Sequence, residues 1–144
     1  MNISGLQYNL NRKTLEIYVS GCYGECRGCH NKELWDFSLG KDYREFLEKI
    51  EKRIKTGMVM HIWILGGDPL DQNWVDLAGL ISKLKEYHKK IWVWTRYHKD
   101  DIPENILEMI DYLKTGEYRE DLPGYTCPLT GVELASNNQK IIKL

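Results

Sequence analysis

Short runs of β-branched and aromatic residues recur along the sequence, and amphipathic segments separate them. Each run has the length and composition of a buried strand. Strands that are apolar on both faces are typical of parallel sheets, in which the crossover segments cover the two faces. The sequence therefore predicts strands at residues 14–20 (TLEIYVS), 58–65 (MVMHIWIL), 91–95 (IWVWT), 111–115 (DYLKT) and 140–144 (KIIKL).

The segments between these runs have the periodicity of helices. A capping-box pattern of Asp42 and Glu45 marks the start of the first helix, and Gly57 supplies its end. A second helix covers residues 74–88, and a short third helix covers residues 103–110. The two longer apolar stripes consist of Tyr43, Phe46, Leu47, Ile50 and Ile54, and of Trp74, Leu77, Ala78, Ile81 and Leu84.

The alternation of strands and helices predicts an α/β fold with a mostly parallel sheet covered by helices. The 144 residues suit one domain with a real core, but they fall short of the roughly 250 residues of an eight-fold barrel. An open, partial barrel or a flat doubly wound sheet remains, with a long loop over residues 116–138. In both architectures, ligands bind at the carboxyl ends of the strands.

Three unusual segments follow the first three predicted strands. The cysteine loop GCYGECRGCHN (21–31) comes directly after the first strand. Gly66-Gly67-Asp68 follows the second strand, and Thr95-Arg96-Tyr97 follows the third. Because the carboxyl ends of parallel strands meet at one edge of a sheet, we expect the three segments to form one composite site.

The composition is ordinary, with 42% hydrophobic and 28% charged residues and a net charge of −1. This balance gives no reason to expect a nucleic acid or a membrane as a partner. No apolar run approaches the roughly 20 residues that cross a bilayer, and the N-terminus lacks the order of a signal peptide. We therefore expect a cytoplasmic protein with reduced thiols, whose clustered cysteines serve metal binding or catalysis rather than disulfides.

Three of the four cysteines, Cys22, Cys26 and Cys29, lie within eight positions, and three interpretations compete. A cluster of thiols without metal would be prone to oxidation and to adventitious metal capture. A structural zinc would need His30 or Cys127 as a fourth ligand, but His30 directly follows Cys29 and Cys127 stands alone. An iron–sulfur cubane held by three thiolates would leave one iron open to an external ligand.

The cysteine spacing after the first strand, together with GGDP after the second, is similar to the pattern of the radical S-adenosylmethionine (SAM) superfamily. The segments VSGC, CRGCHNKELWDF, LGGDPL, KIWVWTRY and SNNQKII resemble, in that order, the activating proteins of anaerobic ribonucleoside-triphosphate reductase. This resemblance covers nearly the whole chain. It implies a partial, open (βα) barrel of the radical SAM type, which forms a single radical SAM domain over residues 1–144.

The resemblance also implies roles for individual residues. Cys22, Cys26 and Cys29 would bind a [4Fe-4S] cluster, whose open iron takes the amino and carboxylate groups of SAM. Gly66, Gly67 and Asp68 would hold the methionine end, with the Asp68 carboxylate accepting hydrogen bonds from the ammonium. The other implied contacts are those of Gly28, Cys29 and His30 with the adenine, of Thr95 near the cofactor, and of Ser136, Asn138 and Gln139 in a terminal polar motif.

Several of these residues also have a plainer interpretation. His30 could be a surface imidazole without a role, and Thr95 and residues 136–139 could serve hydrogen bonding within loops. The expected role of Trp63, Trp74 and Trp92 is core packing, and Cys127 is expected to be a bystander thiol.

Three stretches depart from the family's pattern. Arg96 stands where the family usually has a glycine, and such an arginine could contact the SAM carboxylate, meet the partner or point to solvent. NLNRKT (9–14) replaces a glycine-rich approach to the first strand, and Ala135 and Asn137 replace small Gly and Ser residues. None of these departures falls on the three cysteines.

The implied activity is that of a radical SAM activase, an oxidoreductase. A reduced cluster would pass one electron to SAM, and the resulting 5′-deoxyadenosyl radical would remove a hydrogen atom from a glycine of the large subunit of anaerobic ribonucleoside-triphosphate reductase. A reductant such as flavodoxin or ferredoxin would supply the electron. The alternatives are a radical SAM enzyme acting on a small molecule of the deazapurine type, an activase of a different glycyl radical enzyme and, more remotely, a zinc-binding or electron-carrier module.

Overall fold

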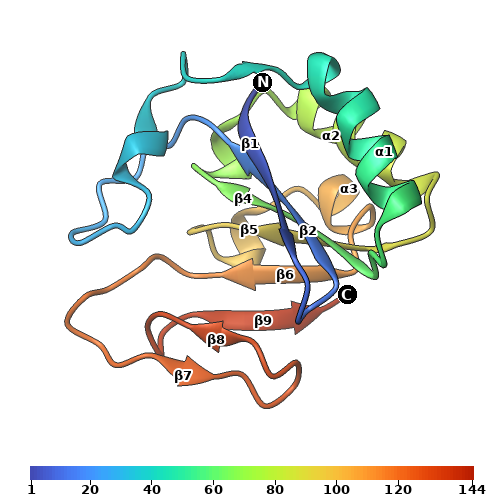
Figure 1. The fold of residues 1–144 in the computed structure, drawn as a ribbon. Helices are drawn as coiled ribbons and strands as arrows, with labels where there is room; N and C mark the ends of the chain where they lie inside the picture. Colours follow the sequence, from blue (N-terminus) through green and yellow to red (C-terminus); the bar gives the residue numbers. More distant parts are fainter.

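One seven-stranded sheet organises the chain, with the strand order β3-β1-β2-β4-β5-β6-β9 (Figure 1). The computed structural model describes residues 1–144. The four central strands β2, β4, β5 and β6 are parallel, whereas β1 and β9 run antiparallel to their neighbours. The strands of this sheet are β1 (Asn2–Asn9), β2 (Thr14–Val19), β3 (Lys41–Asp42), β4 (His61–Gly66), β5 (Lys90–Trp94), β6 (Tyr112–Thr115) and β9 (Lys140–Lys143).

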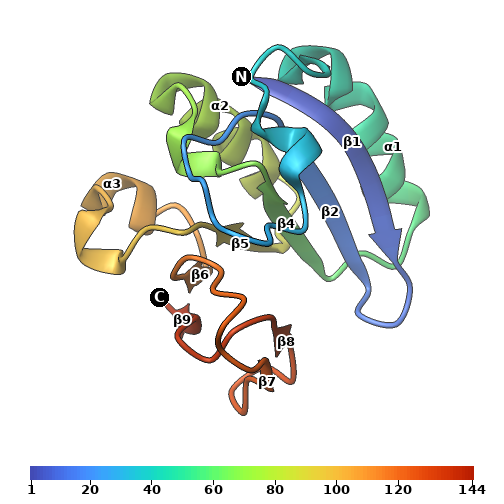
Figure 2. The same ribbon diagram turned by 90° about the vertical axis from the view of Figure 1, so that its left-hand side faces the viewer.

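The three α-helices lie on the outer side of the sheet (Figure 2). They are α1 (Leu47–Thr56), α2 (Trp74–Lys85) and the single turn α3 (Glu104–Leu107). The side chain of Asp42 accepts a hydrogen bond from the Arg44 amide at the start of a 3₁₀ turn that leads into α1, and Asn73 caps α2 in the same way. The 3₁₀ turns are η1 (Lys32–Trp35), η2 (Tyr43–Phe46), η3 (Pro69–Asp71) and η4 (Lys99–Asp101). No helix has both the length and the apolar character that a membrane span requires.

The five predicted strands are all present, and the parallel arrangement is confirmed for the first four of them. The prediction missed β1, because Gly5 and polar residues interrupt its apolar pattern, and it missed the two-residue edge strand β3. It also missed the small hairpin of β7 (Tyr125–Thr126) and β8 (Glu133–Leu134), which interrupts the predicted long loop. Both β1 and β7 are hairpin partners of a neighbouring strand in the sequence, and periodicity within one segment does not report such pairing.

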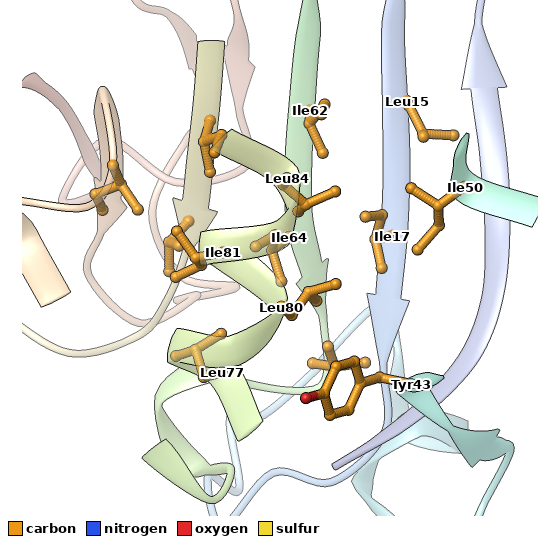
Figure 3. Close-up of a cluster of buried hydrophobic side chains, with 14 of the residues drawn as sticks. Leu15, Ile17, Tyr43, Ile50, Ile62, Ile64, Leu77, Leu80, Ile81 and Leu84 are labelled. Carbon is orange, nitrogen blue, oxygen red and sulfur yellow. The ribbon is translucent and has the colours of Figure 1, made fainter. Parts of the chain in front are cut away.

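The larger core lies between the sheet and the helices (Figure 3). Alternate residues of β2 and β4 point toward α2, and Ile17, Ile64 and Leu80 are fully buried there. The stripe on α2 meets these strands as the 3.6-residue period predicts. The buried members labelled in the figure are Leu15, Ile17, Tyr43, Ile50, Ile62, Ile64, Leu77, Leu80, Ile81 and Leu84.

The opposite face of the sheet is aromatic. Trp63 and Trp92 pack there in a smaller core whose other members come from the C-terminal segment: Cys127, Val132, Leu134 and Ile141. The core role predicted for Trp63 and Trp92 is confirmed. Cys127 is 4% exposed in the same core, and its role as a bystander thiol stays a prediction. The core role predicted for Trp74 is wrong, because its side chain is 48% exposed at the first turn of α2.

Candidate functional site

The three loops singled out from the sequence line one cavity of about 240 Å³ at the carboxyl ends of the central strands. Figure 1 shows the cysteine loop, in light blue, leaving the sheet on the same side as the segment that follows β6. The three segments therefore lie together, as expected for one composite site. The predicted residues that line the cavity are Cys22, Cys26, Cys29, His30, Gly66, Gly67, Asp68, Thr95 and Gln139.

Gly28, like Ser136 and Asn138, is an exception among the predicted site residues. It does not line the cavity, and a Cβ at this position would meet Glu120 Oε2 at 2.3 Å. Its φ of +72° is in the left-handed region that favours glycine. Gly28 therefore allows a tight turn in the cysteine loop beside residue 120, and the structure gives no support to a contact with adenine.

Backbone hydrogen bonds fix the ends of the cysteine loop. The Gly21 amide donates to Leu34 O at 2.8 Å, and the Cys22 amide donates to Trp35 O at 3.2 Å. Two sulfurs already accept amide hydrogens, because Gly24 N lies 3.2 Å from Cys22 Sγ and Asn31 N lies 3.4 Å from Cys29 Sγ. Both contacts lie within the cysteine loop itself.

Burial raises the pKa of the Cys22 thiol to about 11, and the nearby Asp68 and Asp71 carboxylates act in the same direction. The Gly24 amide and the Arg96 side chain oppose this shift. Without a metal, Cys22 is thus a protonated thiol at neutral pH rather than a reactive nucleophile. A metal ion would displace that proton on binding, as is usual for cysteine ligands.

The glycines after β4 pack the second loop against the cysteine loop. A Cβ at Gly67 would lie 2.3 Å from the carbonyl oxygen of Gly21, and a Cβ at Gly66 would lie 2.7 Å from that of Val19. The two backbones are hydrogen-bonded, with the Gly67 amide donating to Val19 O at 2.8 Å and the Asp68 amide to Gly21 O at 2.9 Å. Both glycines line the cavity, but close contact between two loops already requires them.

Asp68 joins the second and third loops. Its carboxylate is buried and accepts hydrogen bonds from Thr95 Oγ1 at 2.7 Å, the Leu70 amide at 3.0 Å and the Arg96 amide at 2.9 Å. Burial raises its pKa, and these donors oppose the shift. Both oxygens already accept protein donors, and the predicted contact of this carboxylate with an ammonium group stays a prediction.

Thr95 and Arg96 are likewise held by the protein. The Thr95 hydroxyl donates to Asp68, which agrees with the plainer interpretation of this residue as a loop hydrogen bonder. Arg96 does not point to solvent: its Nη2 lies 3.0 Å from Asp71 Oδ1, and the Asp71 side chain is only 1% exposed. Asp71 also accepts a 2.6 Å hydrogen bond from the Tyr97 hydroxyl.

Lys114 is a cavity residue that the sequence analysis missed. It lies on β6, is 8% exposed, and forms no ion pair within 4.0 Å. Its ammonium donates to Gly116 O at 2.8 Å and to Thr95 O at 3.4 Å. Burial lowers its pKa to about 8. A lysine in an otherwise apolar strand next to the rim was the available signal, because a buried cation without a carboxylate partner is rare.

The C-terminal segment closes the cavity on the side of the cysteine loop. The rings of His30 and Tyr118 lie 4.7 Å apart, and Arg27 forms an ion pair with Glu120 at 2.6 Å. Ser136, Asn138 and Gln139 fix the segment from its other side, through hydrogen bonds with Arg119 N, Glu117 O and Gly116 O. Hydrogen bonding within loops is thus what these three residues do in this structure, and His30 contacts a protein ring.

Comparison with known proteins gives the family. A family described as a 4Fe-4S single cluster domain matches residues 12–142. The chain is similar to proteins that are each named anaerobic ribonucleoside-triphosphate reductase-activating protein. It is 30% identical over 112 residues to that of Enterobacteria phage T4, which covers 74% of this chain and 72% of the relative.

Two bacterial relatives agree. The chain is 33% identical over 118 residues to the protein of Escherichia coli (strain K12), covering 74% of this chain and 75% of the relative. It is 34% identical over 116 residues to that of Pasteurella multocida (strain Pm70), covering 73% of each chain. With this similarity and three cysteines at one cavity, the chain belongs to the family of anaerobic ribonucleoside-triphosphate reductase-activating proteins and contains a 4Fe-4S single cluster domain.

Proposed function

We propose that this chain is a radical SAM activase, which cleaves SAM reductively at a [4Fe-4S] cluster and removes a hydrogen atom from a glycine of anaerobic ribonucleoside-triphosphate reductase. The observation that carries the proposal is the set of three cysteines at one cavity without a fourth thiol. Cys127 is buried in the aromatic core and does not line that cavity. A cubane held there would keep one iron open to a ligand from outside the protein.

The residues at the cavity fit both parts of such a cofactor. Thiolates are the usual ligands of iron–sulfur clusters, and Cys22, Cys26 and Cys29 are all partly exposed toward the cavity. SAM carries a carboxylate, and the Lys114 ammonium is the buried cation at the cavity that lacks a carboxylate partner. The side chains of Leu65 and Trp94 add an apolar wall. The donor set and the unpaired charge thus support the proposal independently.

When bound, the cluster and SAM would supply a one-electron reduction that converts SAM into a radical able to take a hydrogen atom from carbon. The chain's own task is to orient these groups and to exclude water. The hydrogen bonds from Thr95 and Arg96 to Asp68 hold the second and third loops together, and Gly67 holds the second loop against the cysteine loop. The ammonium of Lys114 would bind the carboxylate of SAM.

The sheet is proposed to act as a partial, open (βα) barrel of the radical SAM type, with residues 1–144 as a single radical SAM domain. Four parallel strands with the cavity at their carboxyl ends support this proposal, because (βα) barrels bind their ligands at that end. We further propose that the reaction takes place in the cytoplasm, that the partner is the large subunit of the reductase, and that flavodoxin or ferredoxin is the reductant.

The test is to reconstitute the protein with iron and sulfide under anaerobic conditions and to add SAM, a reductant and the reductase. We expect about four irons per chain, release of 5′-deoxyadenosine, and a glycyl radical doublet on the reductase by electron paramagnetic resonance. Cys26→Ala should abolish all three, whereas Cys127→Ala, which removes the thiol outside the cavity, should retain them.

Other outcomes separate the alternatives. Zinc at one ion per chain, without iron or sulfide, would overturn the proposal in favour of a zinc-binding module. Release of 5′-deoxyadenosine without a doublet on the reductase would keep SAM cleavage but refute the proposed partner, and would indicate a small molecule or a different glycyl radical enzyme as substrate.

A further inference from the structure

Arg96 is held rigidly at the rim of the cavity. Its Nη2 donates to both oxygens of Asp71, at 3.0 and 3.2 Å, and contacts the Tyr97 hydroxyl at 2.9 Å. The guanidinium also lies over the Tyr97 ring, 4.2 Å from the ring centre. A side chain fixed by a buried carboxylate and by an aromatic face has lost most of its rotamer freedom.

Asp71 connects this arginine to the cysteine loop. Its Oδ2 accepts a 2.8 Å hydrogen bond from the backbone amide of Tyr23, the residue that directly follows Cys22. One oxygen from Asp68, one from Asp71 and the sulfur of Cys22 all lie within 4.8 Å of one another. Two carboxylates therefore lie beside the first cysteine, and Arg96 is the cation bonded to one of them and 3.8 Å from the other.

One buried donor of this arginine has no acceptor. Arg96 Nε is buried and has no hydrogen-bond acceptor, and its distance to Asp68 Oδ2 is 3.8 Å. It lies against Gly24, where a Cβ would be only 2.8 Å from Nε and 3.2 Å from Cys22 Sγ. The nitrogen and the sulfur thus border the same small space, which is open because residue 24 has no side chain. A buried N–H without a partner is unfavourable by about 1–3 kcal/mol, so a nearby acceptor is expected.

We propose that Arg96 is a positioning residue that stabilises negative charge at Cys22 and thereby raises the reduction potential of the cluster bound there. This inference rests on the proposed function, since it assumes the cluster. The physical reason is that one-electron reduction makes the cluster more negative, and a buried cation with a free N–H next to a ligating sulfur favours the reduced state. Without Arg96, Cys22 would face two carboxylates uncompensated.

The test is a redox titration of the reconstituted protein, in which the signal of the reduced cluster is followed by electron paramagnetic resonance. For Arg96→Gln we expect the equilibrium constant for one-electron reduction to fall at least tenfold, which lowers the midpoint potential by about 59 mV. Arg96→Lys, which keeps the positive charge but lacks the planar guanidinium group, should lower the midpoint potential by a smaller amount. Arg53→Gln makes the same change of charge on the exposed face of α1 and should leave the potential unchanged.

A second variant tests the direction in which the midpoint potential changes. Asp71→Asn removes a negative charge from the same group, so the midpoint potential should rise. If Arg96→Gln does not incorporate a cluster, Asp71→Asn decides the question, and an unchanged potential there overturns the proposal. An unchanged potential in a folded, fully loaded Arg96→Gln protein also overturns it. Failure of the unaltered protein to form any iron–sulfur signal refutes the proposed function instead, so the two failures are distinguishable.

Discussion

The two faces of the sheet differ in chemistry and in what covers them. Aliphatic side chains cover the outer face and pack against α1 and α2, with no exposed surface on residues such as Ile17, Ile64 and Leu80 (Figure 3). The other face carries Trp63, Trp92 and Trp94, and the short β7–β8 hairpin and its flanking loops cover part of it. The difference arises from strand alternation, because neighbouring residues of one strand point to opposite faces.

The outer face of the sheet serves stability, whereas the aromatic face has the features of a binding site. On the outer face, burial of aliphatic surface stabilises the fold, and polar atoms play little part. On the aromatic face, the indole N–H groups of Trp63 and Trp94 are buried without acceptors, and Lys114 is buried without a carboxylate. Uncompensated polar groups destabilise a protein and are therefore typical of binding sites. Variants on the two faces should accordingly have opposite effects.

The largest loss of stability is expected on the outer face. Leu80→Ala removes a fully buried side chain between α2 and the sheet and should lower the free energy of unfolding by about 2–5 kcal/mol. The measurement is chemical denaturation at pH 7. Val75→Ala, on the same helix but 80% exposed, is the matched control and should change little. An equal effect of the two variants would contradict the assigned core.

Gly67→Ala should disrupt the site more than the core. Its new Cβ would lie 2.3 Å from the Gly21 carbonyl oxygen, so the two loops must separate, at a cost of about 1–3 kcal/mol. Iron content after reconstitution should fall, because the start of the cysteine loop moves. Gly5→Ala introduces the same methyl group where no atom lies within 4 Å and should retain normal iron content. Normal iron content in both variants would refute the importance of the loop contact.

Lys114→Met should make the protein more stable at pH 7, in contrast to Leu80→Ala. Burial lowers the pKa of Lys114 from 10.5 to about 8. The folded state therefore binds fewer protons than the unfolded state between these values, and the free energy of unfolding rises with pH across that window. Below pH 8 the full cost of burying the charged ammonium remains. Removing it should raise the free energy of unfolding by on the order of 1–3 kcal/mol, after allowance for two lost hydrogen bonds.

The pH profile and ligand binding check this prediction. Lys114→Met should abolish the rise in stability between pH 8 and 10.5 and should weaken binding of SAM to the reconstituted protein. Lys143→Met, on the exposed side of β9, is the control and should keep both properties. A protein that is destabilised at pH 7 and still binds SAM normally would argue against an anion-binding role for Lys114.

The smallest effect is expected for the ion pair between Arg27 and Glu120 at the edge of the cavity. The Arg27 side chain is 91% exposed, so solvent screens the pair strongly. Glu120→Gln should leave the thermal unfolding temperature unchanged within experimental error, and dependence on ionic strength should be equally small. A clear loss of stability would show that this edge belongs to the cooperative core.

The sequence predicts the outer face and the positions of the rim segments well, because both depend on local periodicity and on strand direction. It does not predict Asp71 as a partner of Arg96, or Asp68 as a link between loops, because these contacts join loops that only the sheet brings together. The strand β1 is missed for a different reason: Gly5 and polar residues interrupt the apolar pattern that periodicity detects.

The arrangement of the aromatic face also has an optical consequence. Trp35 and Trp94 line the cavity, and the Trp94 ring lies 4.7 Å from that of Trp63, which in turn lies 5.5 Å from Trp92. Excitation can pass among such closely spaced indoles and on to any chromophore held beside them. An iron–sulfur cluster absorbs broadly in the near ultraviolet and visible range, so its insertion should quench most of the intrinsic emission. The emission of the exposed Trp74 should remain as a red-shifted residual signal. The intensity of tryptophan fluorescence should therefore report how much of the protein contains the cluster.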